Sequence, residues 1–319
     1  MRRILVTGAN GFVGSVLCDV LVKSGFLVRA ATRNSGFRLK GVTEHVVVDG
    51  LGSNTKWNDA LRDVDSVIHL SARAHRVGES PALSDLYLEI NARGTSNLAH
   101  QSALAGVRRF IFLSTIKVNG ESTTTIPFTC SDPRCPIDPY GISKSEGEIG
   151  AISVGGESSM QVAIVRSPLI YGPGVKANFL RLMRWIDKYP ILPLGAVANR
   201  RSIVSVWNLC DLLIRLLQNP LAPISVWTVS DGEDLSTPEL VRRLAVAMGR
   251  RTILLPVPIP MLRMVSRIFA YDEQFDRLCG SLAINIDKTC SDLCWQPPVP
   301  VSVGLAQTVS WYFSKEALS

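Results

Sequence analysis

The sequence lacks an uninterrupted apolar run of the length that a bilayer-spanning helix needs, about 20 residues. One largely apolar stretch, residues 253–270, is broken by three prolines and carries Arg263 and Arg267. We predict a buried or amphipathic segment there, with peripheral membrane contact as the lesser alternative and no stable membrane insertion. The N-terminus also lacks a signal-peptide pattern, because a strand is predicted to start at Ile4, and we expect a cytoplasmic location.

Paired metal-ligand spacing is also missing. The seven cysteines are scattered and odd in number, and Cys290 and Cys294 have no histidine nearby. We therefore expect free thiols in a reducing compartment and no bound metal.

Concentrated charge is a third absence. The chain has 34 basic and 27 acidic residues, for a formal net charge of +7, but the basic residues are dispersed. No lysine-rich tail, basic strip with interleaved aromatics, internal repeat or low-complexity tract occurs. This distribution argues against a nucleic-acid partner and fits a small anionic substrate.

The first half of the chain alternates short apolar segments with helix-like ones. The apolar segments are nonpolar on both faces, as at residues 110–113, which is typical of a buried parallel sheet. The predicted strands are 3–7, 27–32, 45–48, 66–70, 109–114 and 160–166, and the predicted helices are 13–24, 54–62, 82–106 and 140–152. The pattern predicts an α/β fold with a Rossmann-type, doubly wound parallel sheet.

The pattern changes after residue 167, where prolines and glycines become frequent. We predict a dinucleotide-binding domain at 1–167 and a smaller α/β substrate lobe at 168–319, with chain segments crossing between the lobes. The helices predicted there are 177–188, 208–218, 237–248, 261–270 and 302–315, and the strands are 203–206, 226–229 and 283–286.

A glycine turn follows the first predicted strand. Gly8 permits a tight turn, Gly11 lets the backbone approach a pyrophosphate, and Gly14 lets the following helix pack close to the strand. The helix N-terminus then offers unpaired N–H groups to phosphates. The context of strand, turn and helix favours a dinucleotide-binding loop.

Tyr140 and Lys144 lie four residues apart, so on a helix they share a face. A nearby ammonium lowers the pKa of a phenol, which suits Tyr140 to proton transfer. Upstream, Ser114 and Thr115 end an apolar strand, where a hydroxyl can bind a substrate oxygen beside Tyr140.

Together these motifs resemble the extended short-chain dehydrogenase/reductases, the family of nucleotide-sugar epimerases, dehydratases and ketoreductases. The resemblance runs through nearly the whole chain. It is carried by the TGxxGxxG form of residues 7–14, Asp49 with Leu51, the HLSA of residues 69–72, Asn91 with Gly94 and Thr95, the YGPG of residues 171–174, and the closing segment at 287–297.

The resemblance implies hydride transfer between a nicotinamide and a sugar carbon. Tyr140 is then the acid/base, Lys144 binds the nicotinamide ribose and tunes Tyr140, and Thr115 polarises the carbonyl. The expected cofactor contacts are Gly8, Asn10, Gly11, Phe12, Val13, Asp49, Gly50, Leu51, Leu70, Ser71, Ala72, Asn91, Ser114, Tyr140, Lys144 and Ser167. The expected substrate contacts are Thr115, Lys117, Asn178, Arg201 and Arg277.

Simpler interpretations stay open for some of these positions. His69 is better explained as a structural histidine at a strand end than as an acid/base group. Asn91 is compatible with a role that only ties backbone groups together, and Ser71 and Ser167 with packing roles.

The residue that follows the second predicted strand, 27–32, indicates whether the cofactor is NAD or NADP. NAD enzymes place a carboxylate there for the ribose hydroxyls, but no acid follows until Glu44. Arg33 follows that strand, and an arginine pairs with a 2′-phosphate in bidentate fashion. We therefore favour NADP(H) bound by Arg33, with NAD(H) as the alternative.

The residues after Thr115 narrow the reaction. Family dehydratases carry Asp-Glu there, whereas this chain has Ile116 and Lys117, which disfavours dehydration. The segments at 116–120 and 174–179 resemble a bacterial surface-polysaccharide branch of UDP-sugar 4-ketoreductases and 4-epimerases. Our leading hypothesis is reduction of a UDP-4-keto-6-deoxy-N-acetylhexosamine of the UDP-N-acetylquinovosamine type. The alternative is a UDP-glucose or UDP-N-acetylglucosamine 4-epimerase with tightly bound NAD.

A third function and a partner are also considered. The third function is a non-catalytic NADP-sensing regulator on this fold, which the complete set of Thr115, Tyr140 and Lys144 disfavours. The resemblance also implies a homodimer formed through the helices predicted at 82–106 and 140–152.

Overall fold

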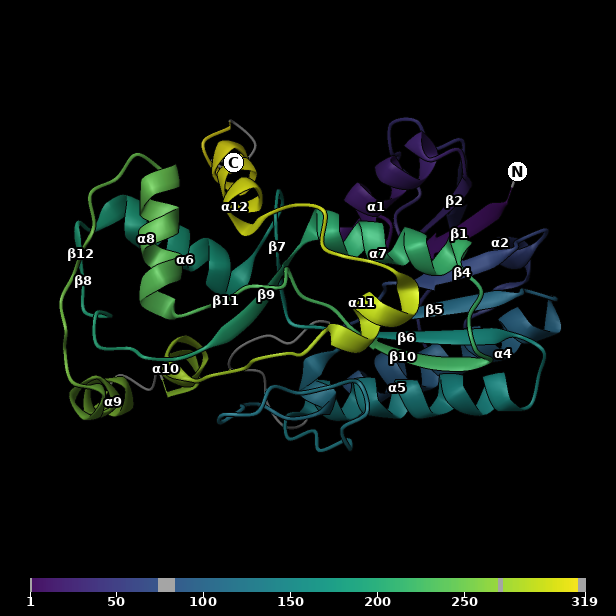
Figure 1. Cartoon of the computed structure of the whole chain (residues 1–319). Coiled ribbons are helices and arrows are strands. Elements are labelled where there is room, and N and C mark those ends of the chain that lie inside the picture. Colours follow the sequence, from purple (N-terminus) through teal and green to yellow (C-terminus); the bar gives the residue numbers. More distant parts are fainter. Residues whose placement is uncertain (1, 74–83, 269–271, 315–319) are drawn as a thin grey trace.

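The computed structural model describes residues 2–73, 84–268 and 272–314, and its centre is a seven-stranded parallel sheet (Figure 1). In spatial order the strands are β10 (Ile224–Thr228), β6 (Gln161–Ser167), β5 (Arg109–Thr115), β4 (Ser66–His69), β1 (Arg3–Thr7), β2 (Leu27–Thr32) and β3 (Glu44–Val47). The chain runs outward on one side of β1 through β2 and β3, and on the other side from β4 to β6. The prediction of a Rossmann-type sheet is confirmed, and ligands of such sheets bind beyond the strand ends where the order reverses.

Helices cover both faces of this sheet (Figure 1). On one face α1 (Phe12–Lys23) and α7 (Val206–Gln218) bury Leu17 and Leu209 against the strands. On the other face α4 (Gly94–Leu104) and α5 (Pro139–Gly156) bury Leu98 and Ala151. The central strands β1, β4, β5 and β6 are almost entirely buried, which explains their apolar sequences, whereas the edge strand β3 is only partly buried.

The helix predicted at 82–106 is corrected by the structure. Its described part consists of α3 (Ser84–Tyr87), the π-helical η2 (Leu88–Arg93) and α4, while residues 82 and 83 lie outside the described residues. A Cβ atom on Gly94 would stand 1.7 Å from the carbonyl oxygen of Leu51, so glycine permits this close approach. The wider π turn lies directly before that contact.

The smaller lobe is built around two short sheets. Its strands are β7 (Leu169–Tyr171), β9 (Arg201–Ser205) and β11 (Asp234–Leu235) in one sheet, and β8 (Ile191–Leu192) and β12 (Ile253–Leu254) in the other. Its helices α6 (Ala177–Lys188), α8 (Thr237–Ala247) and α12 (Val301–Tyr312) share one apolar core. Two further helices, α9 (Ile259–Ile268) and α10 (Asp272–Cys279), contact this core through Ile259 and Cys279.

Several boundaries and elements differ from the prediction. The helix predicted at 54–62 is reduced to α2 (Asn58–Leu61), and the strand predicted at 283–286 forms only an isolated bridge between Ile284 and Phe128. The helix predicted at 261–270 begins two residues earlier, and residues 269 and 270 lie outside the described residues. The strands of two or three residues and the short helices α10 and α11 (Asp287–Leu293) were not predicted. Elements this short are too brief to show a clear hydrophobic periodicity in the sequence.

β10 and α7 come from the second half of the chain, yet they complete the main sheet and its cover. The sheet therefore includes residues on both sides of the 167/168 boundary. Within the described ranges, no helix combines the length and the apolar character that crossing a membrane requires.

Candidate active site

The glycine turn lies between β1 and α1 at the centre of the sheet. Gly8 has a φ of +69°, which L side chains rarely adopt, and a Cβ atom on Gly14 would stand 2.1 Å from Gly8 O. Gly11, the N-cap of α1, supplies no side chain to cap the first-turn N–H groups. Asn10 and Gly11 are exposed, while Phe12 is half-buried. This narrow cradle with uncapped amides fits a dinucleotide pyrophosphate.

His69, at the end of β4, is enclosed in a hydrogen-bond network. Thr7 Oγ1 lies 2.7 Å from His69 Nδ1, and Thr95 Oγ1 lies 3.1 Å from His69 Nε2. Ser71 N donates to Thr7 Oγ1 at 3.3 Å, which ties the segment after β4 to β1. Burial, followed by the Lys144 charge, lowers the pKa of His69 to about 3. With both ring nitrogens engaged, His69 is neutral and its contacts favour the structural interpretation.

Asn91 on η2 is fully buried, and its amide is fully engaged. Its Oδ1 accepts from Arg73 N at 2.8 Å, and its Nδ2 donates to Arg73 O at 3.1 Å and to Ser143 Oγ at 3.0 Å. Asn91 therefore ties the segment after β4 to α5. These contacts favour the alternative in which it holds backbone groups in place.

Three hydroxyls gather at the ends of β5 and β6. Thr115 is paired in register with Ser167, and Ser167 Oγ donates to Ser114 O at 3.2 Å. Ser114 Oγ is buried without a hydrogen-bond partner in the described part of the chain. A buried hydroxyl without a partner is costly, so this atom fits a contact to a bound cofactor.

Lys144 reaches the same strand end from α5. Its Nζ donates to Leu113 O at 2.7 Å and lies 3.8 Å from the centroid of the Phe112 ring. Burial lowers the pKa of Lys144 to about 7, and the Glu148 charge opposes this effect. The ammonium is thus held beside β5 by a carbonyl and an aromatic face.

Tyr140 precedes Lys144 by one helical turn and is half-buried. Burial raises its pKa, and the nearby Asp138 and Tyr87 raise it further. From the sequence we predict that Lys144 lowers the pKa of the Tyr140 phenol, and this prediction is wrong because the pKa is raised. The physical reason is that desolvation dominates, while the Lys144 ammonium hydrogen-bonds to Leu113 O instead.

Asp138 joins the start of α5 to the segment after Thr115. Its Oδ1 caps the helix by accepting from Gly141 N at 2.6 Å, and its Oδ2 lies 2.5 Å from Lys117 Nζ. A Cβ atom on Gly141 would stand 3.1 Å from Lys117 O, so the two segments touch. The segment after Thr115 is thereby joined to the start of α5, the helix that carries Tyr140 and Lys144. Sequence reasoning missed Asp138, although Asp-Pro before a helix is a recognisable N-cap signal.

The expected adenine side lies beyond β3 and β4. Asp49 is exposed, Gly50 and Leu51 are partly buried, and Leu51 O packs against Gly94 as described above. Leu70 and Ala72, directly after β4, are also partly buried. Val13, in the first turn of α1, is half-buried as well.

Arg33 follows β2 and is exposed, with no ion-pair partner among the residues the structure describes. Glu44, the nearest following acid, lies at the opposite end of the strands. It pairs with Arg3 at 3.0 Å and with Arg29 at 2.7 Å. These two arginines occupy the Glu44 carboxylate, which leaves Arg33 as the charged side chain at the end of β2.

The two candidate diphosphate-binding arginines both lie in the smaller lobe. Arg201 begins β9 and donates to Gly280 O at 2.8 Å, and Arg277 lies on α10. Burial and then the Arg277 charge lower the pKa of Arg201. Guanidinium groups are the side chains best suited to bidentate contacts with a diphosphate.

Asn178, the remaining substrate candidate, lies at the start of α6 and is half-buried. The turn before it contains Gly174 at a φ of +90° and Ala177 at a φ of +53°. A Cβ atom on Gly174 would stand 3.3 Å from the Phe12 ring of the glycine turn. The structure therefore places this turn against the first motif of the sequence.

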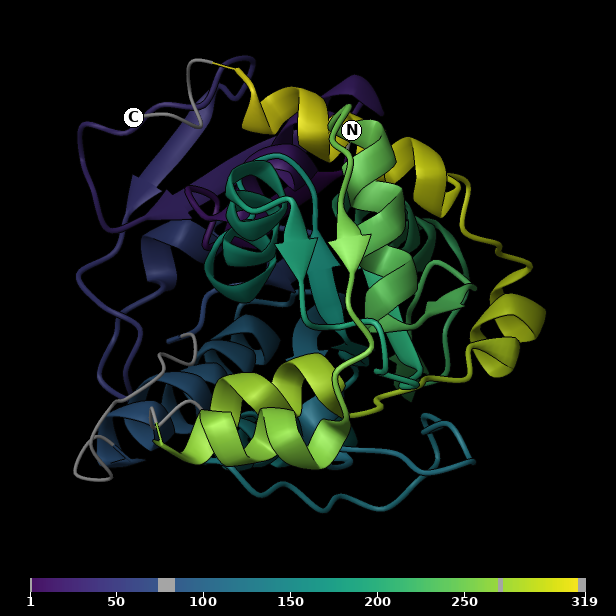
Figure 2. The same ribbon diagram turned by 90° about the vertical axis from the view of Figure 1, so that its left-hand side faces the viewer.

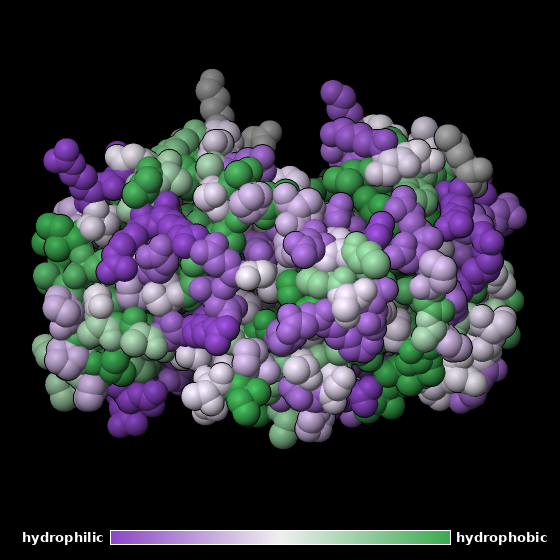
Figure 3. Space-filling model, viewed as in Figure 1, coloured by the Kyte–Doolittle hydropathy of each residue, from purple (hydrophilic) through white to green (hydrophobic). Residues whose placement is uncertain are grey.

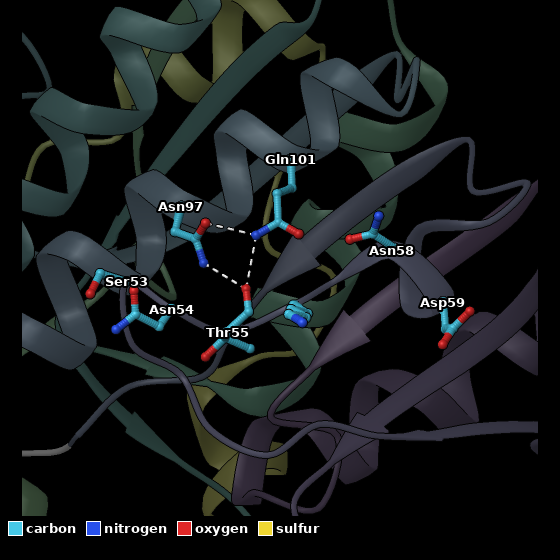
Figure 4. Close-up of a pocket in the computed structure, with 8 residues that line it drawn as sticks. Ser53, Asn54, Thr55, Asn58, Asp59, Asn97 and Gln101 are labelled. Carbon is cyan, nitrogen blue, oxygen red and sulfur yellow. Dashed lines mark hydrogen bonds between the residues drawn. The ribbon is translucent and has the colours of Figure 1, made fainter.

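A separate polar hollow lies between α4 and residues 53–59 (Figure 4). Its volume is about 500 Å³. Asn97 and Gln101 each donate to Thr55 O at 2.8 Å, which holds this segment against α4. None of the expected site residues lines the hollow.

Comparisons with known proteins show the family and the fold of the chain. The family model described as "NAD dependent epimerase/dehydratase family" matches residues 4–227. A UDP-glucose 4-epimerase of Vibrio cholerae is 42% identical over 311 residues, which cover 96% of this chain and 94% of that protein. An N-acetyl-alpha-D-glucosaminyl-diphospho-ditrans,octacis-undecaprenol 4-epimerase of Escherichia coli O157:H7 is 24% identical over 325 residues, 98% of this chain and 95% of that protein. A solved structure of MoeE5 in complex with UDP-glucose and NAD shares the fold, with a TM-score of 0.77, 24% identity, and coverage of 99% of this chain and 100% of that one.

Proposed function

The chain belongs to the NAD dependent epimerase/dehydratase family of nucleotide-sugar enzymes, and we propose that it is a 4-epimerase of a UDP-hexose or UDP-N-acetylhexosamine. The observation that carries this proposal is the 42% identity to a UDP-glucose 4-epimerase over 96% of the chain. The 4-epimerase was the alternative on sequence grounds, and the similarity makes it the first candidate. The 4-ketoreductase becomes the second candidate.

In the proposed reaction Tyr140 takes the proton from the sugar C4 hydroxyl and later returns it. The nicotinamide, when bound, supplies reversible hydride acceptance at C4. Thr115, at the end of β5, donates a hydrogen bond to the carbonyl oxygen that forms. Lys144, which follows Tyr140 by one helical turn, would bind the nicotinamide ribose when the cofactor is present.

The substrate nucleotide is proposed to extend toward the smaller lobe. Arg201 and Arg277 would bind its diphosphate, because guanidinium groups form bidentate hydrogen bonds with phosphate oxygens. Asn178 and the turn before α6 would contact the sugar nucleotide between the glycine turn and these arginines.

The second candidate is a 4-ketoreductase that uses NADP(H). It is favoured by Arg33, which is exposed after β2, and by Glu44, which is bound to Arg3 at the other end of the strands. A reductase consumes its cofactor at each turnover and must exchange it. An epimerase returns the hydride to its own product.

The two candidates are separated by supplying UDP-glucose deuterated at C4 to the purified chain without added reductant. If the chain is an epimerase, we expect UDP-galactose that retains the deuterium, because the deuteride taken from C4 returns to C4. UDP-N-acetylglucosamine and a UDP-4-keto-6-deoxy-N-acetylhexosamine with NADPH are tested in parallel. No epimerisation of either sugar, together with one NADPH consumed per 4-keto sugar, would replace the proposal by the reductase.

The catalytic assignment is tested with Tyr140→Phe. This variant is expected to lose activity by about 10²-fold or more while still binding the nucleotide cofactor. Tyr189→Phe, at an exposed tyrosine of the smaller lobe, is the matched control and should keep full activity. Turnover by Tyr140→Phe equal to that of the control would refute the assigned role.

A further inference from the structure

α9 carries its apolar side chains on the outside. Met261, Met264, Val265 and Ile268 are spaced at i, i+3, i+4 and i+7, so they form one stripe along the helix. The exposed fractions of Met261, Met264 and Ile268 are 55%, 58% and 70%. We call these four residues the α9 stripe. A helix that packs on a protein core normally turns such a stripe inward.

The polar side of α9 is the side that is fixed to the protein. Arg263 Nη2 pairs with Asp276 Oδ1 at 3.0 Å, and its guanidinium lies 5.0 Å from the centroid of the buried Phe275 ring. Ser266 is buried and donates to Asp272 Oδ1 at 3.0 Å. These contacts with α10 set the rotation of α9, so the stripe points outward because the opposite side is anchored.

The apolar surface continues beyond α9. Ile191 on β8, Ile253 on β12 and Leu255 after it are all exposed. Figure 2 shows β8, β12 and α9 on the same side of the molecule, and Figure 3 shows hydrophobic residues gathered at the left-hand edge over β8 and β12. We call the α9 stripe together with these three residues the β12–α9 surface. Exposed apolar residues gathered on one side of a protein mark an interaction site.

Cations border this surface. Arg267 on α9 and Arg251 before β12 are exposed, and neither has an ion-pair partner in the described ranges. Two carboxylates of α10 are engaged, since Asp276 pairs with Arg263 and Asp272 accepts from Ser266. Unpaired arginines beside an outward apolar stripe complement a negatively charged lipid surface.

We propose that the β12–α9 surface docks the protein on an anionic phospholipid bilayer. The α9 stripe lies among the lipid headgroups and upper acyl chains, and Arg251 and Arg267 contact lipid phosphates. This is binding at the interface and requires no helix to span the membrane. The proposal goes beyond the proposed function, and its test involves no turnover.

The test is co-sedimentation of the full chain with vesicles of phosphatidylcholine alone or of phosphatidylcholine and phosphatidylglycerol. The wild-type chain is expected to bind the phosphatidylglycerol vesicles and to bind less tightly as salt is raised. The double variant Met264→Gln with Ile268→Gln should bind about tenfold more weakly, because two apolar side chains leave the interface. Arg267→Gln should weaken binding only to the anionic vesicles.

Val246→Gln is the matched control, since Val246 is 80% exposed on α8 and lies outside this surface. It should bind vesicles as the wild-type chain does, and the melting temperatures of all variants should match. Failure of the wild-type chain to bind anionic vesicles would overturn the proposal, as would equal binding by the double variant. A change in oligomeric mass caused by the double variant, measured by light scattering without lipid, would assign the surface to a second copy of the chain and would also overturn it.

Discussion

Lys117 Nζ and Asp138 Oδ2 are 2.5 Å apart, and this ion pair joins the segment that follows Thr115 to the helix that carries Tyr140. Glu121 approaches the same ammonium at 3.0 Å. Sequence reasoning assigned Lys117 to the substrate, and the structure shows that it also ties two parts of the site together. The relative position of Thr115 and Tyr140 therefore depends on an ion pair in which neither residue takes part.

A double-mutant cycle with Lys117→Met and Asp138→Asn should give a coupling of about 1–2 kcal/mol in the free energy of unfolding, because both side chains are largely buried. Urea denaturation measures it. The exposed pair of Arg62 and Asp59 is the control and should couple by less than about 0.5 kcal/mol. Equal coupling in both pairs would show that Lys117 and Asp138 are no more than a surface contact.

Arg33→Asp should raise the Kd for NADPH at least about tenfold, because a bidentate contact to the 2′-phosphate is lost and a repulsive charge is added. The Kd for NADH should stay the same or fall. Fluorescence titration with both cofactors measures this change. Arg62→Asp makes the same change of charge at another exposed arginine and should leave both values unaltered. Unchanged NADPH affinity in Arg33→Asp would remove the assignment.

Arg166→Met should reduce the free energy of unfolding by about 3–5 kcal/mol, because it leaves the Glu148 carboxylate buried without its main partner. Arg166 Nη2 lies 2.7 Å from Glu148 Oε2, and both side chains are almost fully buried. Arg134 approaches the same carboxylate at 3.3 Å but is one-third exposed, so Arg134→Met should cost about 1 kcal/mol or less. Denaturant unfolding of both variants measures the two losses of unfolding free energy. Equal losses would show that Arg166 is not the main partner of Glu148.

Lys144→Met should flatten the dependence of stability on pH above neutrality. Burial lowers the pKa of Lys144 to about 7 in the folded chain, whereas an unfolded lysine titrates near 10.4, about its ordinary value. Between these values the unfolded chain binds the extra proton, so stability rises with pH and is lost as pH falls toward 7. The slope is up to about 1.4 kcal/mol per pH unit.

Urea denaturation at several values of pH between 7 and 10 compares the wild-type chain with Lys144→Met. The cysteines that titrate in this range are present in both chains, so the difference between slopes reports Lys144 alone. Parallel slopes would mean that the folded chain keeps Lys144 charged throughout.

Local sequence patterns were sufficient to predict six of the seven strands of the main sheet and the glycine turn, but they assigned the strand at 226–229 to the smaller lobe. The bounds of β1, β2 and α6 are as predicted, because alternation, helical period and turn residues are properties of neighbours in the chain. The same patterns also placed Thr115, Tyr140 and Lys144 at strand and helix ends that the structure brings together. Their roles in catalysis remain predictions until the Tyr140→Phe variant is measured.

Contacts between distant segments were decided only by the tertiary structure. Nothing in the sequence pairs Lys117 with Asp138, and nothing shows that the amide of Asn91 is fully engaged. The raised pKa of Tyr140 likewise reflects burial by the whole fold. The period of α9 shows that it is amphipathic, but only its anchoring by Asp276 and Phe275 turns the apolar stripe outward. Periodicity fixes which residues share a face, whereas packing decides where that face points.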